Sequence, residues 1–473
     1  MKYVFCFMLV WPLLGTAQID PVLDEWKKDP DLAHASFGFS LLNAKTGSVL
    51  AEYQSQLALV PASTLKLLST YAALSKLGQH YRFETKFYTT GKLDPATGVL
   101  DGDLIIVGSG DPTIQSEHFA KDNLLSTDKW AKQIKEKGIK EIRGKVIADA
   151  SCFDRRIPDE WIWADISNYY GSIPCGISFS DNAFTLDFST GENNSKAKLQ
   201  GLSPAYASTS ISVTTDVVAN GTEDKAIVYG DPFSFSKEVR GTLPPNKKHF
   251  EIKAALPDPA LLCAEALCKS LVAFGVKCSP AQAVSEYVYR ESGDERQFLF
   301  SHLSPYLDNI VTITNLKSVN LFSETMVKVL GKGDGQKGIE EVLHYWETRG
   351  MNLSSLSMKD GSGLSRANTL CAELLSKVLC KIYNDTENYK VFSASLPVAG
   401  RSGSMSNIGK GKFIENNMRA KTGYMERVRA YSGYLKGRSG KDLAFTLIVN
   451  NYSCSPKDMK LKIEKFLSAM EAY

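Results

Sequence analysis

The alternation of hydrophobic and polar positions is the first guide to how the chain is organised. Residues 35–53 alternate on both sides of a polar turn at 43–47, which predicts a β-hairpin. Residues 63–77 carry apolar side chains at helical spacing, with Pro61 before the segment and Gly78 after it. The first region is therefore expected to run strand, turn, strand and helix.

The pattern changes twice further along the chain. From about 83 to 290, short alternating runs are separated by Gly, Pro, Asn and Asp, which predicts β-rich structure with few helices. Helical periodicity returns at 318–331, 337–349 and 369–384, and alternation returns at 419–423, 428–436 and 442–450 before an amphipathic helix at about 456–472. The first two and last three strands can share one antiparallel sheet. We therefore expect an α/β (α+β) domain built from 18–82 and 291–473, with 83–290 inserted into it.

The first 17 residues have the pattern of an export signal. Lys2 precedes an apolar run at 3–14, and small residues at 15 and 17 fit cleavage after Ala17. The alternatives are a short buried segment or a retained anchor, but the run is too short to span a bilayer. No other stretch is long and apolar enough for a transmembrane helix. We expect an exported protein, periplasmic or associated with the cell envelope, without an integral membrane segment.

Composition narrows the function classes. The 473 residues are 43% hydrophobic and 23% charged, as in globular proteins, and the net charge of +3 predicts no nucleic-acid partner. The six histidines are scattered without HxH or HExxH spacing, so neither a metal site nor a cofactor is expected. Nine cysteines become eight once Cys6 leaves with the signal. Disulfides are then permitted, although buried thiols account for most of these positions.

Nucleophilic catalysis by a serine is the chemistry that remains to be tested. The sequence lacks the G-x-S-x-G elbow, so a lysine one helical turn after the serine is the candidate base. Ser-x-x-Lys occurs four times, beginning at residues 63, 126, 195 and 234. Only Ser63 opens an apolar helix in which Lys66 can be desolvated and its pKa lowered. Ser126 is typical of a helix cap, and the copies at 195 and 234 lie in polar or charged turns.

Two further short motifs also occur in duplicate. Ser-x-Asn occurs at 180–182, before an alternating strand of the insert, and at 318–320, before an apolar helix. We favour Ser318 and Asn320, although either copy can be a turn or a helix cap. Lys-Thr-Gly occurs at 45–47, in the first hairpin turn, and at 421–423, beside a predicted strand. At the second copy, Gly423 lets a ligand approach the backbone closely.

The order Ser-x-x-Lys, Ser-x-Asn, Lys-Thr-Gly is the signature of penicillin-recognising serine enzymes. Together with the segments below, it makes the chain resemble the D-alanyl-D-alanine carboxypeptidases of the penicillin-binding protein 4 type, the class C low-molecular-mass penicillin-binding proteins. The supporting segments are Gly-Asp-Pro-Thr at 110–113, Asp-Asn-Ala-Phe-Thr-Leu at 181–186, Asp-Gly-Ser-Gly-Leu-Ser-Arg at 360–366, Leu-Pro-Val-Ala-Gly at 396–400 and Ser-Gly-Tyr at 432–434. The resemblance covers essentially the whole mature chain.

The resemblance implies a fold and an activity. The fold is a transpeptidase-like domain, an antiparallel sheet flanked by helices, with two nested β-rich domains inserted over 83–290 and the inner one at about 109–190. The activity is a serine DD-peptidase that removes the terminal D-alanine from peptidoglycan stem peptides, with DD-endopeptidase cleavage of cross-links as an extension. It needs no cofactor, and β-lactams are expected to acylate it.

The same resemblance assigns the catalytic roles. Ser63 would attack the penultimate D-alanine carbonyl, with Lys66 as its general base. Ser318, helped by Lys421, would relay the proton to the departing nitrogen. Asn320 would bind the substrate amide.

The resemblance also assigns the substrate-binding roles. Thr422 would contact the terminal carboxylate, and the backbone N–H groups of Ser63 and Tyr424 would form the oxyanion hole. Ser362, Arg366 and, from the insert, Asp165 would lie near the stem-peptide side chain.

Departures from the family pattern and competing functions complete the prediction. Tyr424 stands where the family usually has Thr, and Val319 replaces a commoner polar residue, which affects rate and drug affinity. A β-lactamase is one alternative, but Ser63 and Ser318 are 255 residues apart, which is too far for a small class A enzyme, and no Glu-x-x-x-Asn follows Ser318. A catalytically silent peptidoglycan-binding protein is the other, and it predicts damage to motifs that are intact here.

Overall fold

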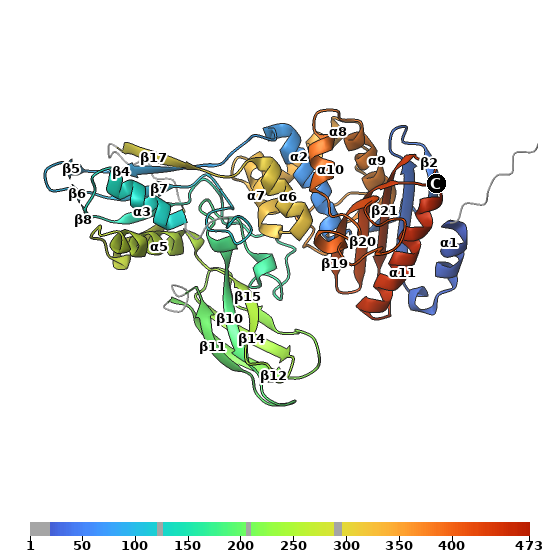
Figure 1. Cartoon of the computed structure of the whole chain (residues 1–473), viewed down its shortest axis with the longest axis horizontal. Helices are drawn as coiled ribbons and strands as arrows, with labels where there is room; N and C mark the ends of the chain where they lie inside the picture. The colour runs from blue at the N-terminus through green and yellow to red at the C-terminus, as the bar shows by residue number, and fades with distance from the viewer. Residues whose placement is uncertain (1–18, 121–125, 205–209, 288–295) are drawn as a thin grey trace, which may run out of the picture.

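The protein is elongated, with its two ends formed by different parts of the chain (Figure 1). The computed structural model describes residues 19–120, 126–204, 210–287 and 296–473. The expected signal peptide at 1–17 lies outside the described residues. Within these ranges, no helix has the length and apolar character that crossing a bilayer requires.

One end is built on a five-stranded antiparallel sheet that joins the two termini of the chain, as the alternation predicted. The strand order is β19-β20-β21-β1-β2. The strands are β1 (Ser36–Asn43), β2 (Val49–Tyr53), β19 (Met418–Met425), β20 (Val428–Lys436) and β21 (Asp442–Asn450). β1 pairs with β21 from Ser36 opposite Asn450 to Asn43 opposite Leu443. The N-terminal hairpin is thereby locked into the C-terminal sheet, with β19 at one edge.

Helices cover both faces of this sheet because its strands are apolar on both sides. One face packs with α1 (Ile19–Lys28) and α11 (Pro456–Ala469) in a core that includes Phe39 and Phe466. The other face packs against six further helices in a second core, which includes Leu68 and Phe322. These helices are α2 (Lys66–Leu77), α6 (Leu307–Lys317), α7 (Asn320–Leu330), α8 (Gly335–Glu347), α9 (Ala372–Tyr383) and α10 (Tyr389–Ser395). A short pair, β3 (Ala58–Leu59) with β18 (Leu370–Cys371), completes this part.

The insert forms the other end and has its own sheet, in the order β16-β9-β7-β4-β17. Its strands are β4 (Glu84–Thr89), β7 (Leu104–Val107), β9 (Val146–Asp149), β16 (Ala283–Glu286) and β17 (Gln297–Leu303), with α3 (Ser126–Glu136), α5 (Pro259–Ala273) and a small sheet of β5 (Lys92–Asp94), β6 (Val99–Asp101) and β8 (Glu141–Ile142). β17 pairs with β4 and buries Phe300 in the insert core. The insert therefore extends to about residue 303, beyond the expected boundary at 290.

Two three-stranded sheets are nested within the insert and project from it (Figure 1). One contains β10 (Ala183–Ser189), β11 (Lys198–Ser203) and β15 (Phe250–Ala255); the other contains β12 (Ser212–Ala219), β13 (Ile227–Tyr229) and β14 (Ser236–Leu243). The inner unit thus spans about 183–255, whereas we expected 109–190. The difference arises because segments between 104 and 149 pair with β4 and with one another, and so belong to the outer sheet.

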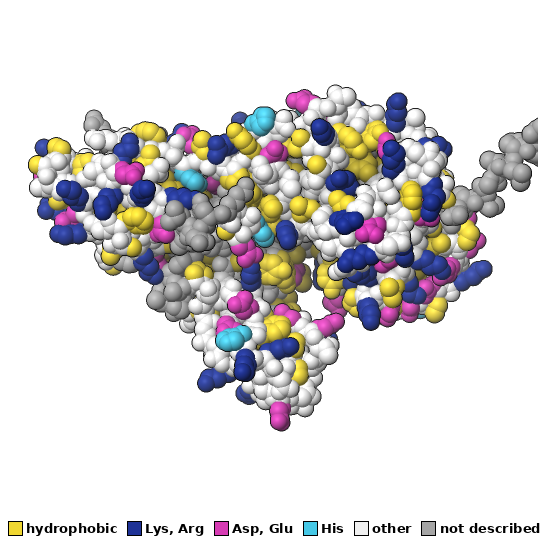
Figure 2. All heavy atoms as spheres, in the orientation of Figure 1, with side chains coloured by type: hydrophobic (Ala, Val, Ile, Leu, Met, Phe, Trp, Pro, Cys, Tyr) yellow, Lys and Arg dark blue, Asp and Glu magenta, His cyan; other side chains and the backbone are white. Residues whose placement is uncertain are grey.

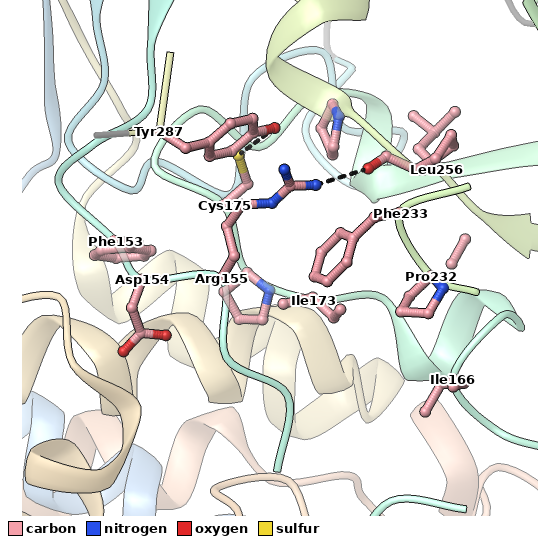
Figure 3. Close-up of a pocket in the computed structure, with 14 residues that line it drawn as sticks. Phe153, Asp154, Arg155, Ile166, Ile173, Cys175, Pro232, Phe233, Leu256 and Tyr287 are labelled. Atoms are coloured by element: carbon pink, nitrogen blue, oxygen red, sulfur yellow. Dashed lines mark hydrogen bonds between the residues drawn. The ribbon is translucent and has the colours of Figure 1, made fainter. Parts of the chain in front are cut away.

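A single arginine joins three segments at the base of the nested sheets (Figure 3). The Arg155 guanidinium lies 4.0 Å from the ring centroids of both Phe233 and Tyr287 and donates a hydrogen bond to the Pro257 carbonyl at 3.5 Å. The pocket left around it has a volume of about 20 Å³, room for about one water. We therefore interpret this pocket as a joint between the inserted segments, stabilised by cation–π contacts.

Most of the described cysteines are buried. Among the described residues, all eight cysteines carry free thiols, and five of them are buried. The Cys268 thiol forms a side-chain hydrogen bond with Cys278, which raises the pKa of Cys268 and lowers that of Cys278.

Candidate active site

The turn that carries Ser63 is held in an unusual conformation by close backbone contacts. Ser63 lies in a 3₁₀ turn, Ala62–Leu65, directly before α2, whereas the periodicity placed it on the helix itself. A Cβ on Gly363 would lie 2.0 Å from the Ala62 carbonyl oxygen, and one on Gly423 would lie 2.5 Å from the Pro61 oxygen. Both glycines therefore allow neighbouring backbone to press against the turn and fix Ser63 in place.

Lys66 lies one turn after Ser63 and has no exposed surface. Its Nζ donates to Ser63 Oγ at 3.0 Å, to Asn320 Oδ1 at 2.6 Å and to the Ser362 carbonyl oxygen at 2.6 Å. Burial lowers the pKa of Lys66 to about 7, against the opposing charges of Asp360 and Glu324. A neutral amine can keep its two bonds to Asn320 and Ser362 and turn its lone pair toward the Ser63 hydroxyl. This geometry is that of a serine and its general base.

A second serine and lysine pair lies in the same site. Lys421, on β19, is fully buried and donates to Ser318 Oγ at 2.8 Å and to the Thr422 carbonyl oxygen at 3.0 Å. Ser318 adopts a left-handed conformation, with φ of 60°, between α6 and α7. Burial, and then the nearby charge of Lys66, hold the pKa of Lys421 well below its usual value. A charge on Lys66 disfavours a charge on Lys421, so the two buried amines can pass a proton through the site.

Asn320 connects the two halves of the site and the insert. It is the first residue of α7, and its Oδ1 accepts from Lys66. Its Nδ2 donates to the Tyr170 carbonyl oxygen of the insert at 2.8 Å. The amide is therefore oriented from both sides.

The edge strand β19 forms one wall of the site. Up to Ala420 its outer edge is covered, since Ala420 N donates to the Pro397 carbonyl oxygen at 2.9 Å. Beyond that point Thr422 and Tyr424 line the cleft. Thr422 Oγ1 donates to Ser404 Oγ at 2.7 Å, and the Tyr424 side chain is 64% exposed beneath the Arg429 guanidinium, 3.9 Å from its ring centroid. Tyr424 therefore lines an exposed part of the cleft and packs against Arg429.

The cleft has a volume of about 630 Å³ and lies between the insert and the sheet. Figure 2 shows the surface hollowed between the nested sheets and the C-terminal part of the molecule. Asp165 and Arg366, together with the neutral Tyr170, line its wall. Burial raises the pKa of Asp165, while Arg366 and a hydrogen bond from Tyr170 oppose this shift. The insert thus brings a carboxylate next to a guanidinium of the catalytic part.

Ser362 is placed differently from the expectation. It was expected near a substrate side chain, but it is fully buried and is not part of the cleft lining. Its carbonyl oxygen instead accepts the hydrogen bond from Lys66. The sequence motif identified a loop that does belong to the site. In that loop the backbone of Ser362, rather than its side chain, contacts Lys66.

The second copies of the motifs lie in structural positions. Asn182 is buried in a short 3₁₀ turn, where its Oδ1 accepts from Phe179 N and its Nδ2 donates to the Ile173 carbonyl oxygen. Ser195 Oγ donates to the Glu192 carbonyl oxygen, and the 45–47 copy is the turn between β1 and β2. None of these residues contributes to the lysine network described above.

Sequence reasoning missed Glu324 and Tyr170. Glu324 lies on α7 one turn after Asn320, and its carboxylate accepts from Gly361 N and Ser362 N. Helical spacing from Asn320 could have indicated it. Tyr170 reaches the site through the fold of the insert, and local sequence gives no signal for that approach.

One group of potential metal ligands lies on the cleft wall. Oxygen and nitrogen atoms of Glu117, His118 and Asp181 lie within 4.8 Å of one another. Glu117 is already paired with Lys253, whose Nζ lies 2.6 Å from Glu117 Oε2. The serine and lysine network contains none of these ligands.

Comparison with a protein-family model gives a match over nearly the whole described chain. The D-Ala-D-Ala carboxypeptidase 3 (S13) family model matches residues 19–470. This range includes the catalytic sheet, the insert and all three motifs.

Individual relatives and solved structures agree with this match. The chain is 25% identical over 444 residues to the D-alanyl-D-alanine carboxypeptidase DacB of Haemophilus influenzae, covering 90% of this chain and 88% of the relative. It is 28% identical over 457 residues to a D-alanyl-D-alanine carboxypeptidase of an Actinomadura species, covering 92% and 80%. The crystal structure of penicillin binding protein 4 from Haemophilus influenzae superposes with a TM-score of 0.78 at 23% identity, covering 96% of this chain and 99% of that one. The nested arrangement of inserted sheets is consistent with that fold.

Proposed function

As this chain belongs to the D-Ala-D-Ala carboxypeptidase 3 (S13) family and is a serine-type D-Ala-D-Ala carboxypeptidase, we propose that Ser63 is its nucleophile and Lys66 its general base. The Ser63 hydroxyl proton passes to the neutral Lys66 amine while Oγ bonds to the penultimate D-alanine carbonyl carbon. The 3.0 Å separation and the pKa of about 7 support this transfer near neutral pH.

The leaving group receives its proton from the second serine and lysine pair. The proton taken by Lys66 is relayed through Ser318 Oγ, which Lys421 holds at 2.8 Å, to the nitrogen of the departing D-alanine. The carbon–nitrogen bond then breaks and the acyl group remains on Ser63. Asn320 binds the substrate amide, and the Thr422 hydroxyl contacts the terminal carboxylate.

The tetrahedral intermediate places negative charge on the former carbonyl oxygen. The backbone N–H groups of Ser63 and Tyr424 form the oxyanion hole, so replacement of the family's usual Thr by Tyr424 leaves this donor in place. Water then attacks the acyl-enzyme and releases the product. Glu324 does not take part in this hydrolysis, because it is buried outside the cleft.

The substrates are peptidoglycan stem peptides that end in D-Ala-D-Ala. The two relatives described above, both D-alanyl-D-alanine carboxypeptidases, support this substrate class. Asp165 and Arg366 line the cleft beyond Asn320, and together they fit a stem-peptide side chain that carries both an amine and a carboxylate. Endopeptidase cleavage of cross-linked stem peptides is an extension of the same reaction and requires that a cross-linked stem can enter the cleft.

Two further expectations accompany this function. The protein is exported to the periplasm or cell envelope after cleavage behind Ala17, since its substrate is found there. β-Lactams acylate Ser63 because their strained amide occupies the place of the scissile bond.

The observation that carries the proposal is the fully buried Lys66 amine, hydrogen bonded to Ser63 and held by two further acceptors. Intact mass spectrometry after brief incubation with a labelled penicillin tests it, with Ser63→Ala and the matched variant Ser180→Ala beside the wild type. We expect one persistent adduct in the wild type and in Ser180→Ala, located on the peptide that contains residue 63, and none in Ser63→Ala.

The other outcomes are equally informative. An adduct that survives in Ser63→Ala would overturn the assignment of the nucleophile. Rapid loss of penicillin without an adduct would indicate a β-lactamase, and intact penicillin without an adduct a silent binding protein.

A further inference from the structure

Two buried carboxylates lie behind the nucleophile, and the mechanism above does not use them. Glu324 is 6% exposed and Asp360 is fully buried. Glu324 extends from α7, the helix that Asn320 begins. Asp360 begins the loop that contains Ser362. Burying two carboxylates is costly unless each has strong hydrogen-bond partners.

Both carboxylates accept hydrogen bonds from the backbone of one loop, and Asp360 also accepts from the Trp161 and Asn368 side chains. Glu324 Oε2 accepts from Gly361 N at 3.0 Å, and Oε1 accepts from Ser362 N at 2.7 Å. Asp360 accepts from Gly363 N and Ser365 N at 2.7 and 2.6 Å. The close approach of α7 to this loop depends on the missing side chain at Gly361, since a Cβ there would lie 2.4 Å from Val327 Cγ2.

The opposite side of the same loop binds both the nucleophile helix, α2, and α7. The Gly361 carbonyl oxygen accepts from Ser69 Oγ at 2.7 Å and from Ser323 Oγ at 2.8 Å. The Ser362 carbonyl oxygen accepts from Lys66 Nζ at 2.6 Å. A carboxylate that fixes the Gly361 and Ser362 N–H groups therefore fixes the carbonyl that holds the general base.

Glu324 also acts on Lys66 through its charge. Its negative charge and that of Asp360 raise the pKa of Lys66, against the larger effect of burial. Burial, and then Asp360, raise the pKa of Glu324 itself to about 7. Across the site, the charge of Lys66 helps to lower the pKa of Lys421, the second buried lysine. The charge of Lys66 in turn lowers the pKa of Glu324, so the protonation of each group depends on that of the other.

We propose that Glu324 is a positioning residue for the DD-peptidase reaction, which sets both the place and the charge of Lys66 through the Gly361–Ser362 backbone. The inference rests on the proposed function, because it assumes that acylation of Ser63 needs the neutral Lys66 amine. Glu324 does not touch the substrate, so it acts on the rate of acylation rather than on binding.

Two variants separate position from charge. Glu324→Gln keeps the size of the side chain but removes the charge and turns one amide N–H₂ toward a backbone N–H. Glu324→Asp keeps the charge but is too short to reach both N–H groups. Glu340→Gln, on the exposed surface of α8, is the matched control for loss of a carboxylate.

The readout is the rate of Ser63 acylation by a penicillin as a function of pH, with kcat and KM for a D-Ala-D-Ala peptide. We expect the acidic limb of Glu324→Gln to move to lower pH, by on the order of one unit, because Lys66 loses a neighbouring anion. We expect Glu324→Asp to keep the limb and to lower the plateau rate about tenfold, the effect of one lost positioning hydrogen bond. KM should stay within about twofold in both.

The outcomes are distinguishable from failure of the proposed function. Absence of any Ser63 adduct in the wild type would remove the proposed function itself. A wild-type adduct with an unshifted limb in Glu324→Gln and an unchanged plateau in Glu324→Asp would overturn only the role of Glu324. Thermal unfolding of each variant shows whether it is folded, and if Glu324→Gln is not, the Glu324→Asp plateau and KM still decide the positioning role.

Discussion

Two lysines of this protein belong to a Ser-x-x-Lys motif and are buried, yet only one lies in the arrangement that we propose to be catalytic. Lys66 and Lys237 have 0% and 2% of their surfaces exposed, and burial lowers their pKa values to about 7 and about 8. Lys66 contacts the serine of its own motif at 3.0 Å. Lys237 instead donates to the Asp231 carbonyl oxygen at 2.6 Å and to Ser167 Oγ at 3.4 Å.

The difference comes from the element on which each motif lies. On the turn that leads into α2, a spacing of three residues returns the lysine to the face of the serine. Lys237 lies on β14, and Ser234 Oγ is occupied in a turn, where it accepts from Ser236 N. Burial and a lowered pKa are thus not enough to make a lysine a general base. The helical turn is also needed, because it places the amine next to the serine hydroxyl.

The largest expected contrast is in acylation. Replacing Lys66 by Met should slow formation of the penicillin adduct by about 10³-fold or more, since the general base is lost. Replacing Lys237 by Met should leave the rate within about twofold. Time-resolved intact mass measures both. Similar losses in the two variants would contradict the comparison and would suggest that buried lysines act through folding alone.

A smaller contrast is expected between the two Ser-x-Asn copies. Ser318→Ala removes the relay to the leaving group and should lower kcat for a D-Ala-D-Ala peptide about 10²-fold. Ser180→Ala lies in the insert and should change kcat by less than about twofold. Release of D-alanine is the measurement. A strong effect at Ser180 with none at Ser318 would reassign the second motif.

Much of the fold could be predicted because periodicity reports which face of an element is buried. The strands at 428–436 and 442–450 have the expected bounds, and the sheet does join both termini. The nesting of the insert was misplaced, because strand alternation reveals that a segment pairs but not with which partner. β17 and β4, more than 200 residues apart in the chain, are such a pair.

In the candidate site, too, some features could be predicted from the sequence and others could not. Ser63, Lys66, Ser318 and Lys421 could be chosen from sequence because helical spacing and motif order constrain them. The burial of Lys237 could not be predicted from the sequence, since a charged turn such as the one at 237–238 is usually exposed. Nor could the role of Glu324, because its partners are backbone N–H groups of a loop that is distant in sequence. Contacts made through the main chain leave little trace in side-chain patterns.

The pH dependence of acylation sharpens the comparison of the lysines. Because the reaction needs neutral Lys66, its rate should rise with pH and level off above about 7, falling about tenfold per unit below that value. Lys237→Met should show the same limb, since Lys237 does not contact the site. Acylation rates between pH 5 and 9 test this. A limb that moves in Lys237→Met would show that the two lysines are coupled.

The smallest expected contrast concerns stability rather than rate. The pKa of Lys237 is lower in the folded protein, about 8, than its usual 10.5. Between these values the unfolded chain binds more protons, so stability from this group rises with pH through that window and is reduced below it. The Lys237→Met variant lacks this pH dependence of stability. Its methionine fills a similar volume but leaves the Asp231 carbonyl oxygen without its hydrogen-bond donor.

The wild type should therefore gain about 2 kcal/mol of unfolding free energy relative to Lys237→Met between pH 7 and 10. Denaturant unfolding of the two proteins across this range measures the difference, and Lys225→Met, at an exposed lysine of the same nested unit, is the matched control. A constant difference across the range would mean that Lys237 remains charged in the folded state. The cost of burying that charge would then be offset by the charge of Asp231 alone. Lys237 and Lys66 would in that case differ in their protonation state as well as in their geometry.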